Sequence, residues 1–159
     1  MANNKVSTDV REVVRLSVKL DKRADVVGVM NALERVGIYL TAYVKGQKLS
    51  GNPINRRTGN LSRHIAYEVS AVGGRLQVKV GVVRGAQDVP YARYLEEGTR
   101  PHIIEPKTKK ALAFQMGGEY LAFRRVHHPG NRAFRFLRGS LDENRERVRD
   151  MIVKGALKK

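Results

Sequence analysis

Two glycine pairs, Gly73-Gly74 and Gly117-Gly118, constrain the fold of this 159-residue chain more than any other feature. Each pair separates two short segments in which apolar and polar residues alternate. Glycine reaches the left-handed backbone conformations that tight hairpin turns need, and alternation with a period of two is typical of strands with one buried face. The sequence therefore predicts two β-hairpins, formed by residues 65–72 with 76–82 and by residues 111–116 with 120–126.

The N-terminal region combines a strand pattern with a helix pattern. Residues 11–20 end in an alternating run, which predicts a strand. From residue 22 to about residue 45, apolar side chains recur every three or four positions, as in a helix with one buried face. Asp21 is expected to cap this helix, and Gly28 and Gly37 would allow another element to pack closely against it.

Two further helices are predicted. The first spans residues 90–97, where Pro90 suits a helix start and Gly98 suits its end. The second runs from Phe134 to about Ala156, and its apolar side is formed by Leu137, Leu141, Val148 and Ile152. The predicted order is β-α-ββ-α-ββ-α. This order indicates an α+β fold in which a long N-terminal helix and a C-terminal helix pack on an antiparallel or mixed sheet.

The length suits one domain over residues 1–159, and the chain is short for two. Residues 1–10 are expected to form a flexible tail, and residues 46–60 and 98–110 extended loops. The chain has no cysteine, which excludes disulfides and thiolate sites. No run of 18 apolar residues is present, so we expect a soluble protein with no membrane partner.

The net charge of +16, from 31 basic and 15 acidic residues, favours polyanionic partners. Seven arginines are candidates for contact with DNA phosphates or with acidic groups of a neighbouring subunit: Arg56, Arg57, Arg124, Arg125, Arg132, Arg135 and Arg138. The last three recur every third residue, so they would share one face of a helix that began there. The alternative interpretation is a solvated helix face.

Catalytic and metal-binding patterns are missing from the sequence. His127 and His128 would face opposite ways on a strand, and no metal-ligand spacing such as HExxH occurs. Glu96 and Glu97 follow each other on a predicted helix and so point about 100° apart. We expect one of these glutamates to form an ion pair with a basic residue such as Arg100 and the other to be solvated. The sequence therefore predicts a non-enzymatic protein without cofactor or metal.

Residues 91–102 read YARYLEEGTRPH, and residues 127–138 read HHPGNRAFRFLR. These segments, with AxxF at 111–114 and RTGNL at 57–61, resemble the HK97 gp10-like family of tailed-bacteriophage neck or tail-completion (head–tail joining) proteins. The resemblance covers roughly residues 57–140. The residues expected to serve as its signature and docking element are Tyr91, Tyr94, Glu96, Gly98, Thr99, His102, His128, Pro129 and Gly130. The side chains of Tyr91 and Tyr94 are expected to pack in the core rather than to stack on bases.

The resemblance implies a structural virion protein, assembled in the host bacterial cytoplasm and found in the neck or tail of the particle. Copies would form a homo-oligomeric ring at the head–tail junction that continues the DNA channel and joins the head connector or portal adaptor to tail proteins. A tail-terminator ring that caps the tail tube is the alternative within the same class. The alternative from another class is a free basic protein that binds DNA without sequence preference.

Overall fold

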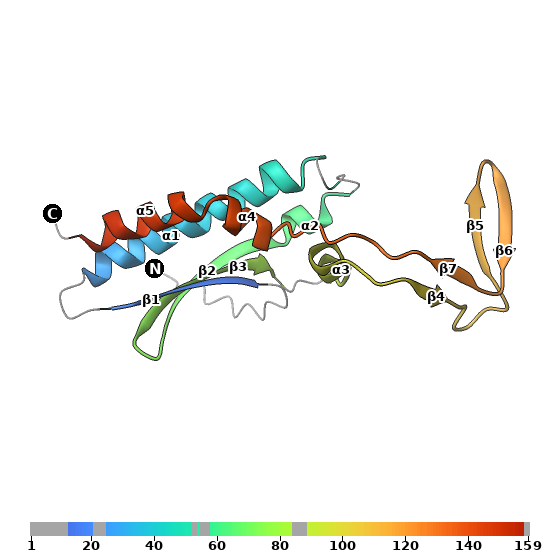
Figure 1. The fold of residues 1–159 in the computed structure, drawn as a ribbon, viewed down its shortest axis with the longest axis horizontal. Helices are drawn as coiled ribbons and strands as arrows, with labels where there is room; N and C mark the ends of the chain where they lie inside the picture. The colour runs from blue at the N-terminus through green and yellow to red at the C-terminus, as the bar shows by residue number, and fades with distance from the viewer. Residues whose placement is uncertain (1–12, 21–24, 52–53, 55–57, 84–88, 158–159) are drawn as a thin grey trace, which may run out of the picture.

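The computed structural model describes residues 13–20, 25–51, 54, 58–83 and 89–157. It has an α+β fold with two unlike parts (Figure 1). In the first part, which we call the body, helices pack on a three-stranded sheet. The second part, which we call the arm, comprises residues 99–131 and projects from one end of the body. The predicted fold class is therefore confirmed, and all the strand pairs are antiparallel.

The sheet of the body consists of β1 (Val13–Lys19), β2 (Ile65–Val72) and β3 (Arg75–Val82). The strand order is β1-β3-β2. The register places Val78 of β3 opposite Leu16 of β1 and opposite Val69 of β2, so apolar side chains of the three strands share one face. The first predicted hairpin, with its turn at Gly73-Gly74, is thereby confirmed.

Helix α1 (Val26–Tyr43) covers the apolar face of the sheet and continues as the π-helix η1 (Val44–Lys48). Five of its side chains lie fully in the core: Val29, Ala32, Leu33, Val36 and Leu40. The predicted cap, Asp21, lies outside the described residues. The helix is capped by Asp25, whose carboxylate accepts a hydrogen bond from the Gly28 N–H at 3.1 Å.

Close packing at the two glycines of α1 is confirmed. A Cβ atom at Gly28 would lie 2.2 Å from the carbonyl oxygen of Gly155, which belongs to α5 (Arg145–Ala156). A Cβ atom at Gly37 would lie 2.3 Å from the ring of Tyr67 on β2. Since real Cβ contacts are never this short, glycine is required for the approach of α5 and of the sheet to α1.

The C-terminal helix differs from the prediction. Residues 134–137 are not helical, and two helices follow instead: α4 (Arg138–Glu143) and α5, separated at Asn144. The Asn144 side chain donates to the Ser140 carbonyl and accepts from the Tyr39 hydroxyl. These bonds hold Asn144 outside helical geometry, with φ −110° and ψ 13°. Side-chain hydrogen bonding of this kind competes with helix continuation.

The predicted loops are only partly loops. In the first one, η1 extends to Lys48, and the short α2 (Asn60–Arg63) begins after Gly59. Arg56 and Arg57 lie outside the described residues, as does the predicted tail 1–10. The second loop contains β4 (His102–Ile104), which pairs with β7 (Val126–His128). Among the described helices, none is both long and apolar enough to cross a membrane.

The second predicted hairpin is present at the tip of the arm. It consists of β5 (Leu112–Met116) and β6 (Glu119–Phe123), joined at Gly117-Gly118. The prediction placed the end of β6 at Val126, whereas the structure ends it at Phe123 and begins β7 at Val126. The break lets the hairpin turn sharply away from the stem of the arm, which β4 and β7 form (Figure 1).

Candidate docking site on the arm

The two signature segments, far apart in sequence, lie side by side at the base of the arm. Thr99 and Asn131 exchange backbone hydrogen bonds of 2.9 and 3.1 Å, and the Thr99 hydroxyl oxygen accepts a third bond from the Asn131 N–H at 2.9 Å. Further out, His102 lies opposite His128, with ring centroids 5.0 Å apart. The signature residues thus build the root of the arm.

Glycine is required where the two segments of the chain meet at this root. Gly98 and Gly130 have φ angles of 74° and 84°, which L-residues rarely adopt. A Cβ atom at Gly130 would lie 2.2 Å from the Thr99 carbonyl oxygen. Across Pro129, the Gly130 N–H donates to Nδ1 of His128 at 3.0 Å, which closes a tight bend. His102 instead donates through Nδ1 to the Arg100 carbonyl at 2.8 Å.

Glu96 fastens the arm to the body. Its carboxylate is almost fully buried, at 3% exposure, and accepts hydrogen bonds from the backbone N–H groups of Leu137 at 2.8 Å and Arg138 at 2.9 Å. These are the first N–H groups of α4, which otherwise have no intrahelical partner. The anionic group also lies at the positive end of that helix. Glu96 therefore links α3 (Tyr91–Glu97), where the arm begins, to α4.

The prediction that one of the two glutamates pairs with a basic residue is confirmed, although the partner is Arg93 and not Arg100. The prediction that the other is solvated is wrong, because Glu96 is buried. The exposed Glu97 accepts instead from Arg93, one helical turn back, at 2.9 Å. That guanidinium holds the pKa of Glu97 below its ordinary value of 4.5. The sequence could not reveal the buried role of Glu96, because its partners lie 41 and 42 residues away.

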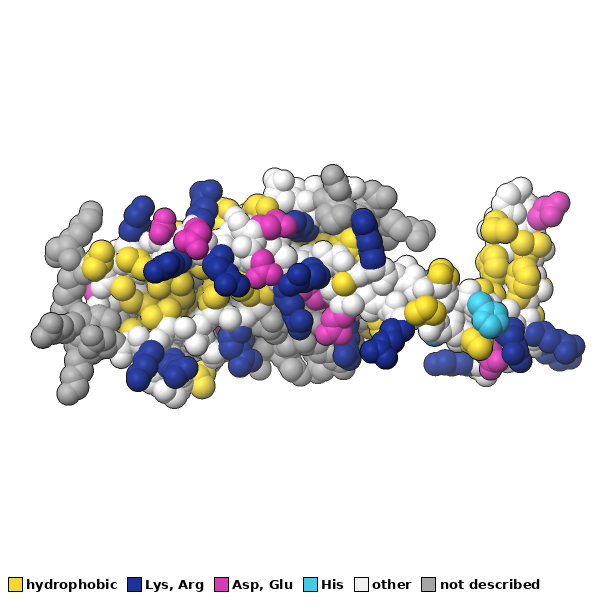
Figure 2. All heavy atoms as spheres, in the orientation of Figure 1, with side chains coloured by type: hydrophobic (Ala, Val, Ile, Leu, Met, Phe, Trp, Pro, Cys, Tyr) yellow, Lys and Arg dark blue, Asp and Glu magenta, His cyan; other side chains and the backbone are white. Residues whose placement is uncertain are grey.

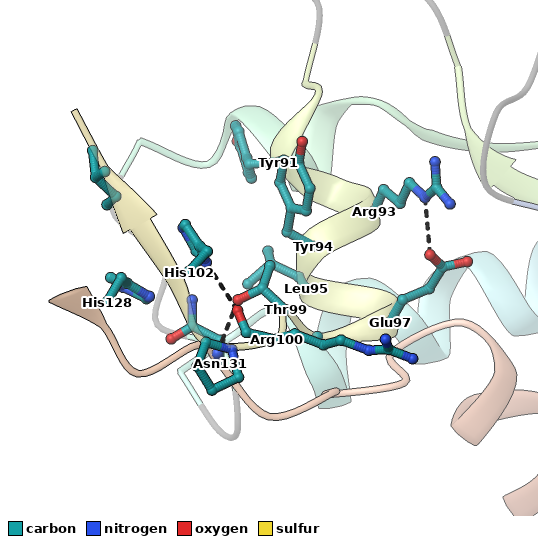
Figure 3. Close-up of a pocket in the computed structure, with 13 residues that line it drawn as sticks. Tyr91, Arg93, Tyr94, Leu95, Glu97, Thr99, Arg100, His102, His128 and Asn131 are labelled. Atoms are coloured by element: carbon teal, nitrogen blue, oxygen red, sulfur yellow. Dashed lines mark hydrogen bonds and ion pairs between the residues drawn. The ribbon is translucent and has the colours of Figure 1, made fainter. Parts of the chain in front are cut away.

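An open groove, which we call the α3 groove, lies between α3 and the stem of the arm (Figure 3). Its volume is about 820 Å³, and its lining includes Tyr91, Tyr94, Pro101, His102, Ile104 and His128. Tyr91 and Tyr94 are 41% and 56% exposed, so the expectation that they pack in the core is wrong. A seven-residue helix at the edge of the body has two sides: Ala92 and Glu96 are buried and Leu95 packs against the core, whereas the two tyrosines lie on the outer side.

The hairpin at the tip of the arm presents an apolar face to solvent. The register places Phe114 opposite Leu121, and Leu112 opposite Phe123. The rings of Phe114 and Phe123 stack with centroids 5.5 Å apart. We call the five apolar side chains of this face the hairpin strip: Leu112, Phe114, Met116, Leu121 and Phe123. Figure 2 shows hydrophobic side chains gathered along the hairpin, with no other element of the described chain against this side.

The candidate arginines do not form the predicted stripe. Because residues 132–137 are not helical and Arg135 has φ 50°, Arg132, Arg135 and Arg138 share no helix face. Arg135 instead pairs with Asp142 at 3.1 Å. Arg124 and Arg125 are exposed where the hairpin joins the stem, and Arg125 lies 4.0 Å from Glu105.

A basic surface that sequence reasoning missed lies on the sheet of the body. On the face opposite to α1, Arg15 is directly across from Lys79, and Lys19 is directly across from Arg75. Glu68 of β2 lies directly across from Lys79 on the same face and places an opposite charge beside it. Lys19 and Arg75 set like charges opposite each other, which destabilises a strand pair unless an anion lies nearby. The alternation in residues 11–20 contained the signal, but the pairing with β3 was needed to bring the charges together.

The described residues contain no group of three or more His, Cys, Asp or Glu side chains placed to hold a metal ion. What the arm offers is binding surface, namely an apolar strip at its tip and an aromatic groove at its root. Comparisons of the chain with protein-family models, with curated proteins and with solved structures found no match.

Proposed function

We propose that this protein is a structural component of a tailed-bacteriophage virion that forms a homo-oligomeric ring at the head–tail junction. The observation that carries the proposal is the arm, which extends an exposed apolar hairpin away from the body (Figure 1). An isolated two-stranded hairpin is at best marginally stable in water. A contiguous exposed apolar patch is typical of a protein interface. The hairpin strip therefore requires a partner surface.

The shape of the molecule favours assembly into a ring. A closed ring needs contacts in which one surface of a subunit meets a different surface of the next. An arm that reaches beyond its own body provides such a contact, because its tip lies away from the root that bears it (Figure 1). The resemblance to neck and tail-completion proteins points the same way, and most of its signature residues lie at the root of the arm.

In this proposal the ring continues the DNA channel and joins the head connector or portal adaptor to tail proteins. Its charge of +16 suits proximity to packaged DNA. A tail-terminator ring that caps the tail tube would use the same arm and remains the alternative position within the particle. Assembly would take place in the bacterial cytoplasm, and the mature location would be the virion.

Immunogold electron microscopy of phage particles produced by the encoding genome tests this function. Antibodies against the chain should label the head–tail junction. Label at the distal end of the tail, or absence of the chain from purified particles, would contradict the proposal. Infection with a phage genome from which the gene for this chain has been deleted should accumulate unjoined heads and tails.

A second function, sequence-independent DNA binding by the free protein, is favoured by the basic face of the sheet. Neutralisation of phosphates by Arg15, Lys19, Arg75 and Lys79 releases counterions and makes affinity fall steeply with salt. Fluorescence anisotropy with a labelled duplex would measure that slope. Tight binding by the monomer, lost when Lys19 and Arg75 are replaced by serine, would support this function over the structural one.

A further inference from the structure

The tip and the root of the arm are complementary surfaces. We infer that the hairpin strip of one copy occupies the α3 groove of the next copy. This inference rests on the homo-oligomeric part of the proposed function and specifies the contact that would hold the ring together. It commits to a second copy of this chain as the occupant of the groove.

The chemistry of the two surfaces supports this pairing. The hairpin strip offers two stacked phenylalanines, a methionine and two leucines. The α3 groove offers the exposed rings of Tyr91 and Tyr94 beside Ile104. Aromatic pairs and sulfur–aromatic contacts are favourable in such an interface, and tyrosine is enriched in protein interfaces because it buries a large apolar ring while its hydroxyl stays hydrated.

Charge also matches across the proposed contact. Residues 111–123 carry a single charged side chain, Glu119, in a chain of net charge +16. The register places Glu119 directly opposite Met116, on the same face as the hairpin strip. The charged side chains that line the α3 groove are the paired Arg93 and Glu97, whose charges offset each other, and the exposed Arg100. Within the part of the chain that the structure describes, neither Glu119 nor Arg100 has an ion-pair partner.

Size separates the α3 groove from a second groove on the described surface. That second groove, between β1 and α5, has a volume of about 310 Å³ and is lined by residues that include Leu16, Ile152 and Val153. The α3 groove, at about 820 Å³, has more than twice that room. A strip of five large side chains needs the larger space. Because tip and root belong to one arm, each copy would donate and accept once, and repetition of that contact builds a ring when its rotation closes.

Disulfide cross-linking tests the inference cleanly, since the natural chain has no cysteine. The variant Met116→Cys/Tyr94→Cys places one thiol on the hairpin strip and one in the α3 groove. Under mild oxidation we expect a ladder of covalent multimers, because each chain would be joined at both ends. The control Tyr120→Cys/Tyr94→Cys has its first thiol on the opposite face of the hairpin and should stay far less cross-linked. Single-cysteine variants cannot exceed dimers.

Charge reversal gives an independent test that leaves the aromatic residues in place. Glu119→Arg and Arg100→Glu should each weaken self-association by about tenfold, because a like charge then faces the partner. The combination Glu119→Arg/Arg100→Glu should restore association to within about threefold of the natural chain. Glu146→Arg, on the exposed surface of α5, is the matched control and should change little.

Distinct outcomes would overturn the inference or the proposed function. Suppose that rings form, but the cysteine pair gives no cross-linked multimers and neither charge reversal changes self-association. That result would overturn the inference and leave the proposed function intact. A ladder obtained with Met116→Cys/Val153→Cys instead would assign the hairpin to the groove between β1 and α5. A chain that stays monomeric while its hairpin inserts into anionic lipid vesicles would overturn both.

Discussion

The body and the arm bury their apolar residues in opposite ways. In the body, Phe136 is fully enclosed and α1 presents an unbroken row of core side chains to the sheet. In the arm, Phe114 and Phe123 stack only on each other, with more than two fifths of each side chain exposed. The body therefore has a closed core, whereas the arm pairs its strands two by two and has no core of its own. This contrast indicates that the arm acquires its packing from another molecule.

The phenylalanines of the two parts test the contrast with the largest expected effect. Phe136→Ala should lower the free energy of unfolding by about 3–5 kcal/mol, because it leaves a cavity in a close-packed core. Phe114→Ala should lower it by at most about 1.5 kcal/mol, because within one chain that ring loses chiefly its stacking on Phe123. Urea unfolding of the monomer measures both. A cost at Phe114 as large as at Phe136 would show that the arm has packing of its own.

The adjacent glutamates sharpen the boundary between the two parts. Glu96→Ala removes a charged acceptor from two N–H groups and should destabilise the protein by about 2–4 kcal/mol. Glu97→Ala removes one exposed, solvent-screened ion pair and should change stability far less. Equal effects in chemical denaturation would mean that Glu96 does not fasten α3 to α4.

Glycines at the root and tip of the arm provide the third comparison. Gly130→Ala combines a positive φ with a clash against the Thr99 carbonyl and should cost more than about 2 kcal/mol or displace the arm. Gly117→Ala also has a positive φ, but nothing lies within 4 Å of its Cβ position, so it should cost about 1 kcal/mol. Hydrogen exchange at Thr99 and Asn131 would report loosening of the root, and equal protection in both variants would contradict this account.

The smallest effect is a pH dependence within the body. The Lys48 ammonium and the Tyr43 hydroxyl both donate to Glu143 and hold the pKa of that carboxyl below its ordinary value of 4.5. The contribution to stability is therefore complete above that ordinary value and is lost as the pH falls through the lowered pKa. For so exposed a group we expect less than about 1 kcal/mol. Acid titration of unfolding should show a shallower fall for Glu143→Gln than for the natural chain.

The local spacing of apolar residues and glycines predicted most elements of the body and little of the docking site on the arm. The two hairpins followed from alternation around Gly73-Gly74 and Gly117-Gly118, and the tight contacts at Gly28 and Gly37 followed from glycine within a helix. Long-range partners could not be predicted this way. The role of Glu96 depends on N–H groups beyond the entire arm, and that bond also helps to place the start of α4 four residues later than its apolar pattern suggests.

The exposure of the arm was also hidden from the sequence. The alternating sequence pattern of a strand is the same whether its apolar face packs on a helix or lies in water. Residues 111–126 therefore resembled an ordinary core hairpin. The tyrosines of α3 were misassigned for a related reason. A three-residue spacing on a short helix does not say which side faces the body, and the inward side is taken by Ala92 and Glu96.

Mass photometry combined with negative-stain electron microscopy tests the central claim most directly. The natural chain should form closed rings at micromolar concentration, and a Phe114→Ser/Leu121→Ser variant, in which only the hairpin strip is altered, should be a monomer. Its unfolding midpoint should match that of the natural chain measured at a concentration too low for assembly. Rings formed equally well by this variant, or a natural chain that stays monomeric at every concentration tested, would contradict the claim that the arm is an intersubunit docking element.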